Sequence, residues 1–338
     1  MALFAGIDLH SNNGYYGIVD STGKRVFSKR LPNKLPEIIE RLEPFKSELE
    51  AVAVEATYNW YWLVDGLMDH GYPMRLANPA AMGQYDGLKH ADDENDAFFV
   101  AELLRLGILP QGYIYPKEER PVRDLLRRRM LLVKQRTTHI LSFQSLLTRQ
   151  TSGHMSGSHI KQLEASDVAG LLGEEHLALA GETNIALIRF LTQRILQMEG
   201  AVKKRIQLKP EYELLLTVPG IGTILGSTIM LETGPIDRFA KVGDYTSYCR
   251  CAKARRTSNG KKKGDNNRKN GNRYLSWAYV EAAHHAMRFL PEAKSFYQRK
   301  AAQTKVCVAT KALASKLSKA CYFIMRDQVP FDKTKMFG

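Results

Sequence analysis

Residues 2–31, "ALFAGIDLHSNNGYYGIVDSTGKRVFSKRL", contain three strand-like patterns in succession. The first pattern, residues 2–9, is an apolar run that includes Asp8 near its end. Two alternating runs follow on either side of residues 21–24, a polar stretch with a glycine that is typical of a hairpin turn. We therefore predict three consecutive strands that are linked as hairpins.

The next part of the chain alternates between helix and strand patterns. Five elements are predicted in the order helix, strand, helix, strand, helix, at residues 35–49, 51–56, 60–70, 73–78 and 93–106. Hairpin-linked strands, followed by strands that alternate with helices, favour an α/β domain in which helices pack against a mixed sheet.

Length and composition narrow the class of protein. The 338 residues suggest about two domains, and 44% hydrophobic residues are enough for an ordinary globular core. A formal net charge of +14 indicates a polyanionic partner, nucleic acid before a membrane. Apolar runs are much shorter than the roughly 20 residues of a membrane helix, and Asp8 and His10 interrupt the apolar start, so no signal peptide is expected. The four cysteines form no C-x-x-C pair, which favours reduced thiols in a reducing cytoplasm.

Beyond the sheet, the chain is expected to be mainly helical. Three domains are predicted, residues 1–150, 151–208 and 209–338. The first ends in a long arginine-rich helix from about residue 118, and three of its arginines are expected to contact nucleic acid: Arg123, Arg127 and Arg128. Residues 151–181 are interpreted as a linker or insertion. Residues 182–206 are a helical connector, whose apolar stripe is a short coiled coil or simply core.

The C-terminal domain begins with a "VPGIG" turn between two apolar helical stretches, which is typical of a helix-hairpin-helix. Gly220 and Gly222 would let backbone N–H groups approach a phosphate at the start of the following helix. An ordinary tight turn between helices is the alternative, because glycine is the usual punctuation of helices.

Residues 250–273, "RCAKARRTSNGKKKGDNNRKNGNR", form a basic segment that we predict to be a loop. It holds ten Lys or Arg residues against one Asp, and several of these are expected to contact DNA phosphates: Arg255, Arg256, Lys261, Lys262, Lys263, Arg268 and Lys269. Ser258 lies among them. Most serines in such loops have no catalytic role, but the positive charge here would hold a phosphate beside the hydroxyl and stabilise a developing alkoxide.

Acidic residues mark the other candidate site. In "KHADDENDAFF", residues 89–99, Asp93 and Asp96 share one face of a predicted helix, while Asp92 and Glu94 fit ordinary helix-start chemistry. Asp8 and Glu55 each end an apolar strand, where a carboxylate is costly to bury unless it is paired or binds a metal. Three elements thus deliver acids to one end of the sheet. Carboxylates suit Mg²⁺, and two such ions can stabilise both the attacking and the leaving oxygen of a phosphodiester.

This order of elements and acids resembles the RNase H-like, RuvC-like nuclease fold. The stretches "AGIDLH", "VEAT", "DDENDAFFVAELL", "VPGIG" and "SNG…KNGNRYLSWAYVEAA" together resemble the bridge-RNA-guided DEDD transposases of bacterial insertion sequences. The resemblance covers residues 5 to about 332. It implies a RuvC-like domain that a helical or coiled-coil connector joins to a mainly α transposase domain with a helix-hairpin-helix.

The resemblance also implies roles for particular residues. The four catalytic, metal-binding acids fall on Asp8, Glu55, Asp93 and Asp96, with Asp92 as a rival for the third place. The nucleophile falls on Ser258, in Ser-Asn-Gly where relatives often have Ser-Gly, and Thr257 is the fallback. The implied cofactors are Mg²⁺, in a two-metal site, and a guide RNA. The implied partners are donor and target DNA, a structured non-coding RNA, and further copies of the chain, as dimers that assemble to a tetramer.

Two other functions fit the same residues. One is a metal-dependent, RuvC-like junction resolvase in which water is the nucleophile and Ser258 is incidental. The other is a non-catalytic DNA- or RNA-binding protein whose acids are structural. Protein that remains covalently attached to cut DNA would distinguish the recombinase from both.

Overall fold

The computed structural model describes residues 1–337 except for 89–91, 207–208, 253–255, 260 and 265–269. It divides into two compact units. One contains Met1–Lys117 and Arg255–Asn270, and the other contains Glu118–Ala254 and Gly271–Gly338. No helix in the described part of the chain is long and apolar enough to cross a membrane.

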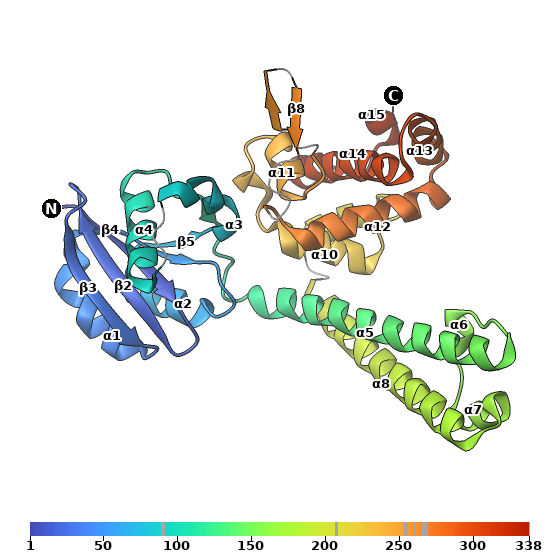
Figure 1. Cartoon of the computed structure of the whole chain (residues 1–338). Coiled ribbons are helices and arrows are strands. Elements are labelled where there is room, and N and C mark those ends of the chain that lie inside the picture. The colour runs from blue at the N-terminus through green and yellow to red at the C-terminus, as the bar shows by residue number, and fades with distance from the viewer. Residues whose placement is uncertain (89–91, 207–208, 253–255, 260, 265–269, 338) are drawn as a thin grey trace. The chain divides into compact units, whose positions relative to one another are not determined.

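The first unit is built on a mixed sheet, as predicted (Figure 1). Within the described residues the strand order is β3-β2-β1-β4-β5-β6, with parallel pairing of β1 to β4 and of β4 to β5 and antiparallel pairing elsewhere. The strands are β1 (Leu3–Leu9), β2 (Asn13–Asp20), β3 (Arg25–Pro32), β4 (Leu49–Glu55), β5 (Met74–Ala77) and β6 (Gln111–Gly112). The helices are α1 (Leu35–Leu42), α2 (Tyr61–Asp69), α3 (Pro79–Met82) and α4 (Asp93–Arg105), with 3-10 turns η1 (Glu43–Glu48) and η2 (Gly83–Leu88).

The helix predicted over residues 35–49 is shorter than expected. It ends at Leu42 and continues only as the 3-10 turn η1. Pro44 explains the break, because a proline ring removes a backbone donor and clashes with the preceding helical turn. Strand β4 consequently begins at Leu49 rather than residue 51. The two-residue strand β6 and the short helix α3 were not predicted, because they lack enough residues to show a period.

The two faces of the sheet are covered by different helices. Alternate residues of β1, including Ile7, join a core with α1 and α2. The other face receives α4, whose backbone approaches Gly6 so closely that a Cβ there would lie 2.5 Å from the Ala101 nitrogen and would overlap the Ala97 carbonyl oxygen. A glycine at this position therefore allows α4 to lie directly on β1, as required to bring the start of α4 to the end of that strand.

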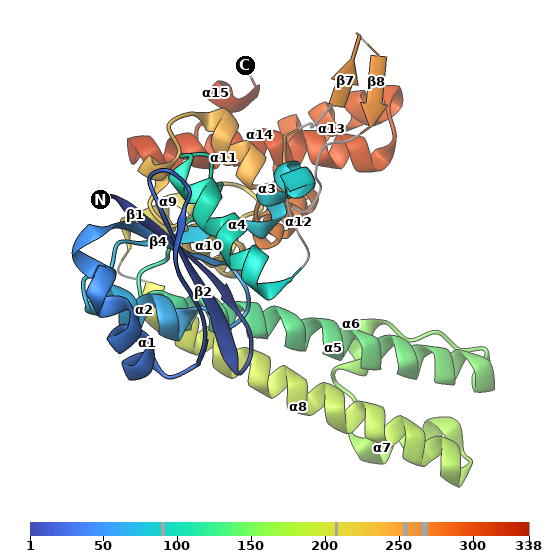
Figure 2. The same cartoon turned by 60° about the vertical axis from the view of Figure 1, so that its left-hand side comes forward.

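The second unit begins with a long helical hairpin (Figures 1 and 2). Helices α5 (Arg120–Thr151) and α8 (Glu175–Ile206) run antiparallel, since Arg129 contacts Glu199 whereas Arg136 contacts Thr192. The apolar stripe of the connector, which includes Ile185 and Ile188, is buried in this unit. Residues 151–181, interpreted from the sequence as a linker or insertion, contain α6 (Gly157–Ile160), α7 (Ala165–Leu172) and the first turns of α8, and their apolar residues pack on the end of the hairpin.

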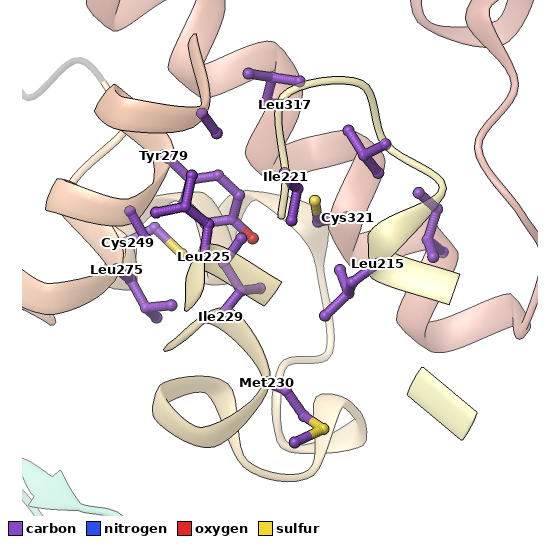
Figure 3. Close-up of a cluster of buried hydrophobic side chains, with 14 of the residues drawn as sticks. Leu215, Ile221, Leu225, Ile229, Met230, Cys249, Leu275, Tyr279, Leu317 and Cys321 are labelled. Carbon is purple, nitrogen blue, oxygen red and sulfur yellow. The ribbon is translucent and has the colours of Figure 1, made fainter. Parts of the chain in front are cut away.

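The rest of this unit is a helical bundle with one apolar core (Figure 3). Its elements are α9 (Pro210–Leu216), α10 (Thr223–Thr233), η3 (Ile236–Arg238), α11 (Val242–Tyr248), α12 (Arg273–Phe289), α13 (Pro291–Gln303), α14 (Val306–Asp327) and α15 (Lys333–Phe337). Buried thiols belong to this core, and burial raises the pKa of Cys251 to about 11 and that of Cys321 to about 12.

The basic segment contains a strand pair where we predicted only a loop. Strand β7 (Arg256–Ser258) pairs antiparallel with β8 (Lys261–Gly264), so that Ser258 lies opposite Lys261. Asn259 adopts a left-handed conformation, with φ of 49°, which Asn-Gly sequences favour in two-residue hairpin turns.

Candidate metal centre and nucleic-acid interface

Two of the predicted acids lie at the same level on neighbouring parallel strands. Ile7 of β1 pairs with Val54 of β4, and Asp8 and Glu55 are the next residues on each strand. Gly6 on β1 and Ala53 on β4 face α4, and Asp8 and Glu55 lie two residues further along on the same face of the sheet. The strand pairing therefore brings Asp8 and Glu55 to one edge of the sheet, on the face that α4 covers.

The start of α4 brings two more acids to this edge. Asp92 is the N-cap, and its side chain accepts a 2.7 Å hydrogen bond from the Asn95 backbone, which lowers the pKa of Asp92. Asp93 and Asp96 follow in the first turn, both half-buried. Asp92 is thus occupied in capping the helix, as the sequence suggested, whereas Asp93 faces Asp8 across a histidine.

The structure brings Asp8 and Asp93 together with His10, which the sequence analysis did not propose. Nε2 of His10 lies 3.2 Å from Oδ2 of Asp8 and 3.4 Å from Oδ2 of Asp93. One donor atom from each residue lies within 4.8 Å of the other two. Among the described residues, Glu55 and Asp96 do not join a group this tight. The compact part of the acid edge is therefore an Asp-His-Asp cluster.

An arginine of β3 pairs with the cluster. Nη2 of Arg30 lies 2.6 Å from Oδ2 of Asp93, and the strand pairing places Arg30, Tyr15 and Asp8 in one row across β3, β2 and β1. Glu94 turns away from the cluster and accepts from Arg25 and Ser28. Arginines of β3 thus balance the charge of Asp93 and Glu94, two of the acids in the first turn of α4.

The donor set fits a divalent cation. Two carboxylate oxygens and one imidazole nitrogen converge, and these are ordinary ligands of divalent metals. Nε2 of His10 is shielded from solvent, yet it makes no hydrogen bond of good geometry with any residue that the structure describes. A polar atom in that position needs a partner, and a cation would supply one.

Two of the arginines expected to contact nucleic acid, Arg123 and Arg127, approach a buried carboxylate. Arg127 of α5 donates two hydrogen bonds, of 2.5 and 2.7 Å, to Glu232 of α10. Nε of Arg123 lies 3.6 Å from the same carboxylate, and Nδ2 of Asn272 donates to it at 2.8 Å. Burial by itself lowers the pKa of Arg127, but the hydrogen bonds and charge of Glu232 raise it well above its usual value. Arg128, by contrast, is exposed.

The two glycines of the "VPGIG" turn have different surroundings. Gly220 has φ of +95°, and a Cβ there would lie 2.5 Å from the backbone nitrogen of Ala286 on α12. Its conformation and its packing both exclude a side chain. Gly222 caps α10 with φ of −95°, and a Cβ there would meet nothing within 4 Å. Only Gly222 therefore has open space beside it.

The ends of the basic segment are joined at its base. The backbone nitrogen of Asn272 donates to the Tyr248 carbonyl at 2.6 Å, and Nε of Arg250 donates to the Gly271 carbonyl at 3.0 Å. Nζ of Lys311 donates to the Arg250 carbonyl at 3.1 Å. Asn272 also caps α12 through its side chain, which accepts from two backbone nitrogens. The residue that contacts Glu232 therefore also fixes the point where the basic segment ends.

The described part of this segment includes few of the predicted contact residues in full. Lys261 is exposed. The backbone is described for Arg256, Thr257, Ser258, Lys262 and Lys263. Arg255, Arg268 and Lys269 lie outside the described residues.

Two family models match the chain, and each matched range contains one of the candidate sites. Residues 5–151 match a DEDD transposase family of the IS110 type, a range that contains all four predicted acids. Residues 212–298 match the family described as "Transposase IS116/IS110/IS902 family", a range that contains the "VPGIG" turn, Glu232 and Ser258. No curated protein matches the chain. Both matches name IS110 and together they include both candidate sites, so the chain belongs to the IS110 family of DEDD transposases, which are DNA-processing enzymes.

Proposed function

We propose that this transposase is an RNA-guided DNA recombinase that cuts and rejoins donor and target DNA through Ser258. The observation that carries the proposal is the convergence of Asp8 and Asp93 at the sheet edge where Glu55 also ends its strand. The range of the second family match contains a serine within a basic strand pair. A divalent cation, Mg²⁺ by resemblance, would be held by Asp8, Asp93, Glu55 and Asp96. It would supply charge stabilisation to the phosphate that reacts.

The proposed step is a phosphoryl transfer in which atoms balance. Oγ of Ser258 forms a bond to phosphorus while the bond from phosphorus to one bridging DNA oxygen breaks, and the serine proton ends on that leaving oxygen through solvent. The product is a phosphoserine ester and a free DNA hydroxyl. A hydroxyl from another strand then attacks the ester, which restores the serine and joins the new strands. No oxidant or reductant is needed.

The strand pair supports Ser258 as the nucleophile. A serine hydroxyl is a weak nucleophile at neutral pH unless a base, a metal or a positive field assists it. The register of β7 with β8 places Ser258 opposite Lys261, and two further lysines follow on β8. Their charge would attract the DNA backbone and stabilise the developing alkoxide.

Nucleic acid would be bound mainly through its phosphates. The net charge of +14, the exposed Arg128 and the basic segment favour contacts to the backbone of DNA and RNA. Gly222, at the open start of α10, would place backbone N–H groups beside a phosphate, in the manner of a helix-hairpin-helix. Sequence choice would then come from base pairing with a bound RNA, as in other RNA-guided enzymes. A tetramer would let acids and serines of different copies meet.

A denaturing gel tests the chemistry. End-labelled DNA is incubated with the protein, its co-purified RNA and Mg²⁺, and labelled DNA that migrates with the protein marks the covalent ester. We expect this band with the wild type, and its loss in Ser258→Ala. Asp8→Asn and Asp93→Asn should lose both the band and strand cleavage, with RNA binding retained.

Other outcomes of the same gel would refute parts of the proposal. Cleavage without any covalent band identifies a water-dependent resolvase. A band that persists in Ser258→Ala and disappears in Thr257→Ala moves the nucleophile by one residue. Binding without cleavage identifies a nucleic-acid-binding protein. Sequencing of the RNA that co-purifies with the chain tests the guide: absence of one structured RNA species contradicts RNA guidance.

A further inference from the structure

His10 has a fixed position beside the acid cluster. It follows β1 by one residue, and its backbone nitrogen donates to the Asn13 carbonyl at 2.8 Å. Its carbonyl accepts from Nδ2 of Asn59 at 2.8 Å and from Nδ2 of Asn33 at 3.0 Å. Three hydrogen bonds from separate segments therefore hold the backbone of a residue that lies outside any strand or helix.

This backbone arrangement directs the imidazole between two carboxylates. Nε2 lies 3.2 Å from Asp8 and 3.4 Å from Asp93, is shielded from solvent, and has no well-formed hydrogen bond within the described residues. A histidine that merely paired with these acids would donate a hydrogen bond to one of them. A nitrogen that instead shares a cation with both carboxylates needs no such bond to either.

We infer that His10 supplies a nitrogen ligand to the metal centre, so that the centre favours Mn²⁺ over Mg²⁺ more strongly than four carboxylates would. Mg²⁺ prefers oxygen ligands and dehydrates reluctantly, whereas first-row transition metals accept imidazole readily. Arg30 reduces the negative charge of the cluster, but it weakens the attraction for every dication alike. The type of donor atom is therefore what distinguishes the metals. This inference depends on the proposed acid-bound metal, but not on Ser258 or on RNA.

Metal binding can be measured directly on the full chain without catalysis. Mn²⁺ titration followed by electron paramagnetic resonance gives its affinity, and competition by Mg²⁺ gives the ratio of the two affinities. We expect His10→Ala to weaken Mn²⁺ binding about tenfold or more and to change Mg²⁺ binding less than about threefold. Pulsed measurements on bound Mn²⁺ should show coupling to an imidazole nitrogen in the wild type and lose it in His10→Ala.

Two further variants separate ligation from general disturbance of the site. His10→Asp replaces nitrogen by oxygen, so it should retain metal binding while the ratio of Mn²⁺ to Mg²⁺ affinity falls. His176→Ala removes an exposed histidine of the second unit and should change nothing. Asp8→Asn should abolish the nitrogen-coupled signal.

The inference is overturned if bound Mn²⁺ shows no imidazole coupling, if that coupling survives in His10→Ala, or if the variant weakens both metals equally. The inference is also overturned if Mn²⁺ does not bind at millimolar concentration, or if it binds equally well to Asp8→Asn. The proposed recombination fails on a separate observation, the absence of a Ser258-dependent covalent band. Each idea can therefore be rejected while the other stands.

Discussion

Replacement of Glu232 by glutamine should strongly destabilise the second unit. The Glu232 side chain is 2% exposed and accepts two hydrogen bonds from Arg127 and one from Asn272. Glutamine keeps the size but removes the charge, and it turns one acceptor oxygen into a donor that faces arginine. Arg127 and Arg123, with side chains 27% and 8% exposed, would then lose their buried counter-charge.

The expected loss is about 3 kcal/mol in the free energy of unfolding. Three charge-assisted hydrogen bonds of about 1.5–3 kcal/mol each set an upper bound. Breaking a buried ion pair from one side costs roughly 3–5 kcal/mol in measured cases. The partial exposure of Arg127 lets water solvate part of its freed charge, which puts the loss at the lower end of that range.

The unfolding of this unit can be followed separately. The chain has three tryptophans, Trp60 and Trp62 in the first unit and Trp277 in α12 of the second. In a background of Trp60→Phe and Trp62→Phe, urea unfolding monitored by fluorescence reports on the second unit, which need not unfold together with the first. Thermal unfolding should show a midpoint roughly 6–12 °C lower, at about 2–4 °C per kcal/mol for a unit of this size.

A matched control and a double mutant make the result specific. Glu292→Gln breaks an exposed pair with Lys333 and should leave the free energy of unfolding nearly unchanged. Arg127→Gln combined with Glu232→Gln should cost less than the sum of the single variants by at least about 1 kcal/mol. A loss below about 1 kcal/mol for Glu232→Gln alone, or strict additivity with Arg127→Gln, would refute the reasoning.

Three further predictions use the same unfolding or metal titrations. Gly220→Ala should cost more than about 2 kcal/mol, because its φ is +95° and α12 blocks a side chain, whereas Gly222→Ala in the same turn should stay within about 1 kcal/mol; equal costs would contradict the packing argument. Burial raises the pKa of Cys251 to about 11 and that of Cys321 to about 12 from 9.0, so these thiols ionise at lower pH in the unfolded chain, and the second unit should lose stability as pH rises from about 9 towards 12. Replacing both cysteines by alanine should reduce part of that loss, and a pH profile of stability that stays unchanged would contradict this prediction. Gly6→Ala should weaken Mn²⁺ binding at the acid edge, because a Cβ there pushes α4 and its first-turn acids away from β1; unaltered binding would mean that α4 does not position the site.

The acid edge could be predicted from sequence because its signal is periodic. Asp8 and Glu55 each interrupt an apolar strand pattern, and parallel pairing of those strands requires only that they be neighbours. His10 carries no such signal. It lies in a short connection, and its contact with Asp93 depends on how α4 sits on Gly6, a tertiary packing that spacing along the chain does not encode.

The arginine-rich helix could be predicted from the sequence, but the intramolecular partner of Arg127 could not. A run of arginines on a helix is typical of a nucleic-acid contact, and the acid that Arg127 binds within the chain lies 105 residues away. One signal was present: Glu232 is a lone acid within the apolar stretch "TILGSTIMLET", the same kind of interruption that identified Glu55. The strand pair around Ser258 also had its signal, since Asn259-Gly260 is typical of a two-residue hairpin turn.

Glu232 and the Asp8–Asp93 pair show why a buried acid can be structural while two partly exposed acids are candidate ligands. Arg127 and Asn272 donate hydrogen bonds to the two carboxylate oxygens of Glu232. A cation there would have to displace Arg127 and break the hydrogen bond from Asn272, the residue that caps α12. At the sheet edge, Arg30 donates to one oxygen of Asp93 only, and the imidazole nitrogen between Asp8 and Asp93 forms no good hydrogen bond with the described residues. A shared cation would give that nitrogen a partner and balance the remaining negative charge of the two acids. The Glu232 network also holds Asn272, so this buried charge stabilises the point where the basic segment joins α12.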